Sequence, residues 1–158
     1  MMARTAPRPA LPPRPAVRGG APPPFRIGRP FVSVWVAASV LNCREHRIAA
    51  WLEDGSLPFA FNIARPGVRR ACVRLATDGL QGLLCGKQPF AALAEFLEAT
   101  FPPETPVYEP ARLAWMMQCD YDHIYNLIRA RALSDVGHRS YEVSRESLFR
   151  FLNERSLT

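Results

Sequence analysis

The sequence predicts a mainly α-helical fold with small β-hairpins, arranged as two similar units in tandem that are joined by a helix. Three observations support this prediction. First, residues 41–57 indicate a turn, then a short amphipathic helix, then a helix end. Second, two alternating apolar runs flank a Pro-Gly turn. Third, the whole pattern recurs weakly later in the chain. A chain of 158 residues has room for one ordinary domain or two small ones.

The first unit is organised around the stretch 41–57. Apolar side chains spaced i, i+3 and i+4 make one stripe that faces a core, and these are Ile48, Trp51 and Leu52. Charged side chains fall off this stripe and face outward, namely Arg44, Glu45 and Arg47. Gly55 ends the helix where a residue with positive φ is favoured. A short helix with a charged first turn suits insertion into the DNA major groove.

The elements around this stretch complete the first unit. Residues 30–32 predict a short extended segment, and Ser33 is a candidate N-cap for a helix that ends at the Asn42 turn. Apolar residues alternate over 59–63 and again over 71–75, so we expect a β-hairpin. The tip of this hairpin, or wing, carries three arginines, Arg65, Arg69 and Arg70.

A short helix follows the hairpin, with Thr77 or Asp78 as its candidate N-cap, and Gly86 closes the unit. Apolar residues at helical spacing then predict an amphipathic helix over about residues 88–101, which two prolines terminate. This helix either bridges two units or packs on one of them.

The pattern of the first unit recurs at an offset of 76 residues. The matched positions are mostly apolar and lie at expected core positions, as in the pairs Leu41 and Met117, Cys43 and Cys119, Ile48 and Ile124, Leu52 and Ile128, Leu57 and Leu133. The offset falls to 68 beyond the second wing, which is eight residues shorter than the first. Chance would less easily supply the same order of helix, turn, helix, strand and capped helix twice.

The basic character of the chain comes from its N-terminus. The net charge is +6, but residues 1–30 hold six arginines and no acid, whereas residues 31–158 hold 14 basic and 14 acidic side chains. Residues 1–29 predict a disordered or polyproline-like arm that would add salt-sensitive phosphate contacts. A solvated leader without a specific role, or an upstream start codon, is the alternative. The prolines argue against the amphipathic helix of a transit peptide.

No catalytic constellation stands out in the sequence. The three histidines have no nucleophile and orienting carboxylate at suitable spacing, and no glycine-rich phosphate loop is present. Cys43, Cys72, Cys85 and Cys119 lack metal-ligand spacing, so we expect small buried core residues in a reducing cytosol. We also expect core positions for Trp35, Trp51, Trp115, Met116 and Met117. No apolar run suits a transmembrane helix or a secretory signal.

Two sets of residues carry a family resemblance. The first set is Val36-Ala37, Leu41-Asn42-Cys43, Ile48 and 51–57. The second set is Leu113-Ala114, Cys119, 124–128, Ala132-Leu133, 139–148 and Phe151-Leu152. These sets resemble the helix-turn-helix of excisionase and MerR-type winged-helix DNA-binding domains, and the two copies cover about four-fifths of the chain. The resemblance implies a second helix in the major groove and a wing along the backbone or minor groove. It also implies a cytoplasmic bacterial or phage regulator or recombination directionality factor.

In the first unit, the expected DNA contacts lie on the helix of stretch 41–57 and at the hairpin tip. Arginine pairs with guanine or anchors phosphate, and a helix N-terminus also favours phosphate. The helix candidates are Arg44, His46 and Arg47. An ordinary charged helix face is the alternative reading of these three. The wing candidates Arg65, Arg69 and Arg70 would contact phosphate or enter the minor groove.

The second unit departs from the DNA-binding pattern. Asp120 and Asp122 stand where phosphates would lie, although acids also suit a helix N-terminus, and Arg131 replaces the helix-ending glycine. The remaining candidates are Tyr121, His123, Asn126 and Arg129 on the helix, with His138 and Arg139 at the short wing. Asn126 would suit adenine. This unit either binds DNA or serves dimerisation or partner binding.

We therefore expect a disordered arm over 1–29, a first winged unit over 30–86, a helical linker over 87–105 and a second winged unit over 106–158. The expected function is sequence-specific binding of double-stranded DNA, as a transcription regulator or an excisionase-like recombination factor, with the tandem units acting as a covalent pseudo-dimer. The alternative is a protein-interaction or assembly module on the same scaffold. We expect no enzymatic activity, cofactor, metal, small-molecule ligand or membrane association, and a cytoplasmic, nucleoid-associated location. A homodimer or a second protein would bind through 106–158.

Overall fold

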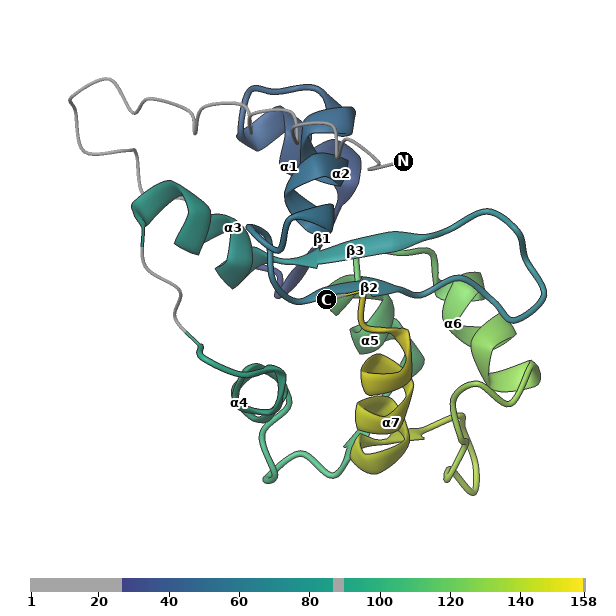
Figure 1. Ribbon diagram of the computed structural model, residues 1–158. Helices are drawn as coiled ribbons and strands as arrows, with labels where there is room; N and C mark the ends of the chain where they lie inside the picture. The colour runs from purple at the N-terminus through teal and green to yellow at the C-terminus, as the bar shows by residue number, and fades with distance from the viewer. Residues whose placement is uncertain (1–26, 87–89, 158) are drawn as a thin grey trace, which may run out of the picture.

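Helices and two small sheets make up the structure, a computed structural model that describes residues 27–86 and 90–157 (Figure 1). These residues form seven helices, a three-stranded antiparallel sheet and a two-stranded antiparallel sheet. The expectation of helices with small hairpins is thus met. Most of the expected N-terminal arm, residues 1–26, and the start of the expected linker, residues 87–89, lie outside the described residues.

The first half of the described chain contains six elements. They are β1 (Phe31–Ser33), α1 (Val34–Val40), α2 (Glu45–Glu53), β2 (Ala60–Asn62), β3 (Val73–Ala76) and α3 (Thr77–Cys85). As expected, the Ser33 hydroxyl caps α1 by accepting a hydrogen bond from the Val36 N–H. Gly55 follows α2 with φ of 77°, and Gly86 follows α3 with φ of 72°. The predicted hairpin forms as the antiparallel pair β2 and β3.

The second half also contains six elements. They are α4 (Leu93–Thr100), β4 (Val107–Tyr108), α5 (Pro110–Met116), α6 (Tyr121–Arg129), β5 (Val143–Ser144) and α7 (Arg145–Arg155). Strands β4 and β5 pair antiparallel. The helix expected over about 88–101 is shorter than predicted, since α4 begins at Leu93 and ends at Thr100.

The second half repeats part of the element order of the first, namely a strand, two helices, a strand and a helix, with the single strand β5 in place of β2 and β3. Helices α1 and α5 begin 76 residues apart, and so do α2 and α6. The turn before the second helix of each pair contains a left-handed residue, Asn42 with φ of 48° and Gln118 with φ of 50°. Arg131 has φ of 57° at the position matching Gly55, a conformation that glycine adopts with less strain. The backbone geometry therefore recurs even where the residue type does not.

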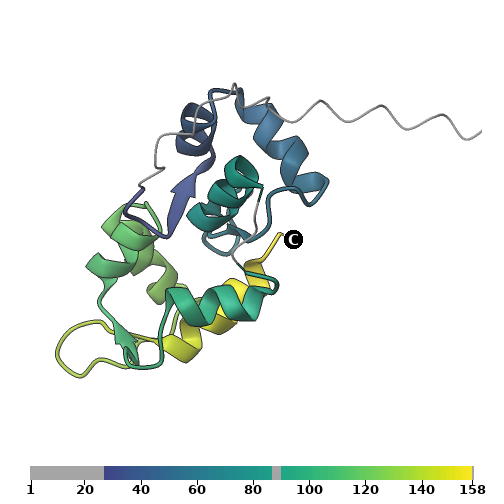
Figure 2. The ribbon, with the colours of Figure 1, turned by 90° about the vertical axis from the view of Figure 1, so that its left-hand side faces the viewer.

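Helices cover the three-stranded sheet on both faces. Its strand order is β1-β3-β2, so the segment expected to be only an extended approach becomes an edge strand. Side chains alternate between the two faces. Val32, Ala60 and Leu75 join the cluster of α1, α2 and α3, whereas Phe31 and Phe61 join the cluster of α4 to α7. Figures 1 and 2 show α1 to α3 on one side of this sheet and α4 to α7 on the other.

Aromatic rings hold α4 against the sheet. The Phe96 ring stacks on Phe59 at a centroid distance of 5.1 Å and meets the Phe31 ring edge-on at 5.7 Å. Past the end of α4, the Phe101 ring lies 5.5 Å from Tyr108 of β4. The Arg145 guanidinium of α7 also donates to the Glu98 carboxylate of α4, so α4 contacts both halves of the chain. Of the two alternatives left open by the sequence, the bridging one is observed.

Polar contacts join the two halves at the turn between α5 and α6. The Arg74 guanidinium on β3 donates to the carbonyl oxygens of Met117 (2.7 Å) and Gln118 (2.9 Å). The Ser33 N–H donates to Gln118 Oε1 at 2.6 Å. At the other edge of the sheet, the Leu157 N–H donates to the Ala60 carbonyl at 2.8 Å, so the C-terminal segment covers the free edge of β2.

Several local expectations are wrong. Trp51 is buried at 4% exposure, but Trp35 and Trp115 are 68% and 49% exposed. Trp35 is exposed because the buried face of α1 is formed by Ala37 and Ala38, and Trp35 lies off that face. The cysteines are not buried core residues either, since Cys85 is exposed and Cys43, Cys72 and Cys119 are half-buried.

The boundaries around α3 also differ from expectation. Neither Thr77 nor Asp78 caps this helix, whose N-cap is Ala76 without a side-chain hydrogen bond. The Thr77 hydroxyl instead donates to the Arg29 carbonyl at 2.6 Å. Ile27 packs against the first core cluster, and the Arg29 guanidinium lies 5.6 Å from the Trp115 ring centroid. The sequence assigned residues 27–29 to the disordered arm, but they contact the folded part.

Phe96 provides a test of the packing between the halves. Its side chain is fully buried, so we expect Phe96→Ala to lower the free energy of unfolding by about 3–5 kcal/mol. Urea unfolding followed by far-UV circular dichroism measures this loss. The exposed Ala94 on the same helix gives a control, because Ala94→Ser should change the stability little. A Phe96→Ala effect as small as that of the control would contradict the bridging role of α4.

Candidate nucleic-acid interface

The first turn of α2 presents basic groups to solvent. Arg44 is the N-cap residue, and the first helical residues are Glu45, His46 and Arg47. The side chains of Arg44 and His46 are exposed and make no hydrogen bond or ion pair with any residue in the described part of the chain. Arg47 is half-buried, with its guanidinium 5.7 Å from the Trp51 ring centroid. Two of the three predicted helix contacts are therefore open to a ligand.

The hairpin between β2 and β3 presents a second basic group. The Asn62 side-chain oxygen accepts hydrogen bonds from the Ala64 N–H (3.1 Å) and the Cys72 N–H (2.9 Å), which holds the two arms of the hairpin together. Gly67 takes φ of 82° at the turn. Beyond these bonds the three predicted arginines, Arg65, Arg69 and Arg70, are exposed. Their guanidinium groups have no ion-pair partner among residues 27–86 and 90–157.

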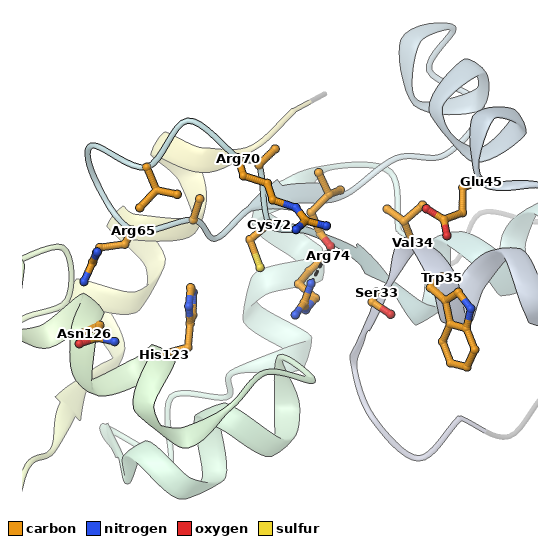
Figure 3. Close-up of a pocket in the computed structure, with 14 residues that line it drawn as sticks. Ser33, Val34, Trp35, Glu45, Arg65, Arg70, Cys72, Arg74, His123 and Asn126 are labelled. Carbon is orange, nitrogen blue, oxygen red and sulfur yellow. Dashed lines mark hydrogen bonds between the residues drawn. The ribbon is translucent and has the colours of Figure 1, made fainter.

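An open cleft of about 660 Å³ lies between the hairpin and α6 (Figure 3). The hairpin contributes Arg65 and Arg70 to its lining, and α6 contributes His123 and Asn126. The His123 Nε2 atom lies 2.7 Å from the Ile63 carbonyl oxygen, a hydrogen bond that holds α6 against the hairpin. The opposite wall includes Trp35 of α1. Both halves of the chain therefore build this cleft.

The cleft shares lining residues with hollows beside α2. Trp35 and Glu45 line the cleft and also line a neighbouring hollow that contains Cys43 and Arg44. Cys43 and Arg44 in turn line a hollow that reaches Arg47. The hollows beside the first turn of α2 therefore share lining residues with the cleft at the arginine hairpin.

The sequence did not indicate two residues of this surface. Trp35 was expected in the core, yet it lines the cleft. Trp35 lies off the helix face that Ala37 and Ala38 bury, and this position could have indicated an exposed ring. Arg74 also lines the cleft, but its guanidinium is already bonded to the carbonyls of Met117 and Gln118. These bonding partners are about 40 residues away in sequence, so no local sequence pattern could predict that Arg74 bonds to them.

The structure separates the candidate residues of the second unit. His123 and Asn126 face the cleft, whereas Tyr121 lies in an exposed row of rings. Its ring centroid is 4.4 Å from that of Tyr125, which is 5.0 Å from that of Tyr141. The two hydroxyl groups of Tyr121 and Tyr125 are hydrogen-bonded, and this bond is the main cause that raises the pKa of Tyr125. Arg129 is exposed at the end of α6.

The second wing is a short loop between α6 and β5. The Asp135 carboxylate accepts hydrogen bonds from the Glu142 and Gly137 N–H groups, both at 3.0 Å, and these bonds lower the pKa of Asp135. His138 and Arg139 are exposed on this loop and do not line the cleft. The six candidates of the second unit therefore do not form one site.

A smaller hollow of about 350 Å³ adjoins the cleft at the turn between α5 and α6. Cys72 and Cys119 both line it. Burial raises the pKa of the Cys119 thiol to about 12, so this thiol stays protonated at neutral pH. Within residues 27–86 and 90–157, no group of three or more His, Cys, Asp or Glu side chains is placed to hold a metal ion.

Comparison of the chain with protein-family models, curated proteins and solved structures gave no match. Among the described helices, none has the length and apolar character needed to cross a membrane. The case for a function therefore depends on the geometry and charge of the surface itself.

Cysteine reactivity tests the environment of this surface. Because the thiolate is the reactive form, we expect Cys119 to stay unreactive toward a thiol reagent such as DTNB in the native protein at pH 8. The exposed Cys85 should react rapidly. Cys85→Ser should remove the fast phase of labelling, whereas Cys119→Ser should leave it unchanged. Loss of the fast phase in Cys119→Ser would contradict the buried environment of this thiol.

Proposed function

We propose that the protein binds double-stranded DNA in a sequence-specific manner, with α2 in the major groove and the arginine hairpin along the phosphate backbone. One observation carries this proposal. The exposed side chains of Arg44 and His46 at the start of α2, and of Arg65 and Arg70 on the hairpin, line hollows that share lining residues, although the two groups are about 20 residues apart in sequence. An arginine at the start of a helix suits a base edge or a phosphate, and arginines on a hairpin tip suit phosphates.

The charge distribution supports this choice of surface. Residues 31–158 carry equal numbers of acidic and basic groups, so the folded part has no general attraction for DNA. Five of the 14 cations of this part lie at the first turn of α2 and on the hairpin, namely Arg44, Arg47, Arg65, Arg69 and Arg70. Glu45 is the single acid that lines the cleft among the described residues. A local basic surface of this kind favours DNA binding in one orientation.

Helix α2 suits base reading better than α6 does. The first turn of α6 exposes Asp120 and Asp122, which would repel phosphates. His123 of the same turn is hydrogen-bonded to the Ile63 carbonyl and is not free to reach a base. We infer that the first half reads DNA and that the second half holds the reading surface in place. This reading fits a winged-helix regulator or recombination factor, which acts by binding energy alone.

Gel-shift titration of the full chain against DNA selected from a random duplex pool tests this proposal. We expect the double variant Arg44→Ala/Arg47→Ala to lose selectivity, with at least tenfold weaker binding, because a good base contact contributes about 1–3 kcal/mol. The variant Arg65→Ala/Arg69→Ala should weaken binding to all sequences and reduce its salt dependence.

Arg112 offers a matched control for these arginine variants. It is an exposed arginine on α5 that does not line the cleft, so Arg112→Ala removes one charge outside the proposed surface. Its affinity for DNA should stay close to that of the unmodified chain. A second control removes residues 1–26. If selectivity disappears with this segment while the Arg44→Ala/Arg47→Ala variant still binds normally, the segment rather than α2 reads the DNA and the proposal fails.

A second role is favoured for the outer face of the second half. Tyr121 and Tyr141 are 45% and 40% exposed, and with Tyr125 they form a row of rings on one surface. Tyrosines of this kind are enriched at protein–protein interfaces, because they bury large area at little entropic cost. We infer that a second copy of the chain binds here, as the neutral charge of residues 31–158 permits.

Sedimentation equilibrium tests this dimer. The expected mass is twice 17.7 kDa, returning toward 17.7 kDa in the variant Tyr121→Ala/Tyr141→Ala. The exposed Trp115 on α5 lies outside the row, so Trp115→Ala is the matched control and should leave the mass unchanged. A monomeric unmodified chain at micromolar concentration would refute the dimer.

A further inference from the structure

We propose that the cleft between the hairpin and α6 binds one nucleotide unit of an unpaired nucleic-acid segment. Its phosphate would lie at the hairpin end and its base would stack on Trp35. This inference goes beyond duplex reading by α2, because a base inside a duplex is already stacked and cannot reach a tryptophan face. The cleft volume of about 660 Å³ falls within the range of roughly 300–1,000 Å³ that is usual for small-molecule pockets.

The hairpin end of the cleft suits a phosphate. Arg65 and Arg70 of the hairpin line the cleft, Arg65 at the far side from Trp35 and Arg70 between them (Figure 3), and neither has an ion-pair partner among the residues that the structure describes. Arginine donates two parallel hydrogen bonds to phosphate oxygens. Arg74 adds positive charge in the same cleft, while its donors stay on the Met117 and Gln118 carbonyls. The anionic part of a ligand is therefore drawn to this end.

The opposite end of the cleft suits a base. Trp35 is 68% exposed, and an exposed indole gives a flat surface on which any base can stack. Glu45 lies at the same end, where its carboxylate would accept a hydrogen bond from an exocyclic amino group and repel a phosphate. The labels in Figure 3 show this separation, with Trp35 and Glu45 on one side and Arg65 on the other.

The two ends together select the ligand. A simple anion would use the arginines but not the indole, and an apolar ligand would leave the arginines unpaired. A nucleotide has an anionic phosphate at one end and an aromatic base with amino donors at the other. Because the cleft is open to solvent, neighbouring phosphates of a strand can continue past Arg65 along the basic hairpin tip, so we assign a strand rather than a free nucleotide.

Fluorescence anisotropy of a labelled 12-nucleotide single strand tests the cleft with the full chain. Trp35→Leu should weaken binding roughly tenfold, in line with the loss of one base stack. Trp115 is the matched control, because it is an exposed tryptophan of α5 outside the cleft, and Trp115→Leu should change the affinity little. Equal affinities of Trp35→Leu and Trp115→Leu would overturn the stacking role.

A second pair of variants tests the phosphate end. Arg70 lines the cleft and the adjacent Arg69 does not, although both are exposed arginines of the same hairpin. Arg70→Ala should weaken single-strand binding more than Arg69→Ala, and a strand of abasic units should remove the effect of Trp35→Leu. Equal losses for the two arginine variants would overturn the assignment of a phosphate site to Arg70. Binding of dAMP as tight as that of the 12-nucleotide strand would overturn the assignment to a strand.

The test separates this inference from the proposed function. Arg44→Ala/Arg47→Ala should remove selective binding of fully paired DNA and leave Trp35-dependent binding of the single strand unchanged, because neither arginine lines the cleft. If no duplex sequence is selected but single-strand binding still depends on Trp35, the proposed function fails and the nucleotide site stands. If a duplex sequence is selected but single-strand binding does not depend on Trp35, the nucleotide site fails and the proposed function stands.

Discussion

Burial of the three-stranded sheet on both faces is the constraint on which the rest of the structure depends. Hairpin sheets usually leave one face to water, but here Phe31 and Phe61 project from the face opposite the first helices. These rings need an apolar cover, which α4 and the second half of the chain provide. The two halves are consequently one packed body around a shared layer.

This packing determines what each helix can do. The flanks of the hairpin are held by Asn62 and by the sheet, so only its arginine tip projects from the body. The second half occupies the space beside the hairpin, and the bond between His123 and Ile63 places α6 there. The two halves are therefore not independent units with a flexible spacing. The start of α2, the hairpin and the cleft all belong to one packed body.

Similar backbones with different side chains account for the asymmetry between the two halves. Helices α2 and α6 have the same length and the same preceding turn, yet one begins beside Arg44 and the other beside Asp120. Opposite charges at the same structural position give opposite preferences for phosphate. The start of α2 is therefore basic and the start of α6 is acidic, a difference that the near-neutral total charge of residues 31–158 conceals.

The sequence by itself determined the local structure, because caps, turns and periodicity act over a few residues. The Ser33 cap, the Gly55 stop and the hairpin around Gly67 all formed as expected. The tertiary structure alone decided that β1 joins the sheet, that Trp35 lines a cleft and that α6 packs on the hairpin. Those outcomes depend on partners 40 to 85 residues away, and no local pattern records which partner covers which face.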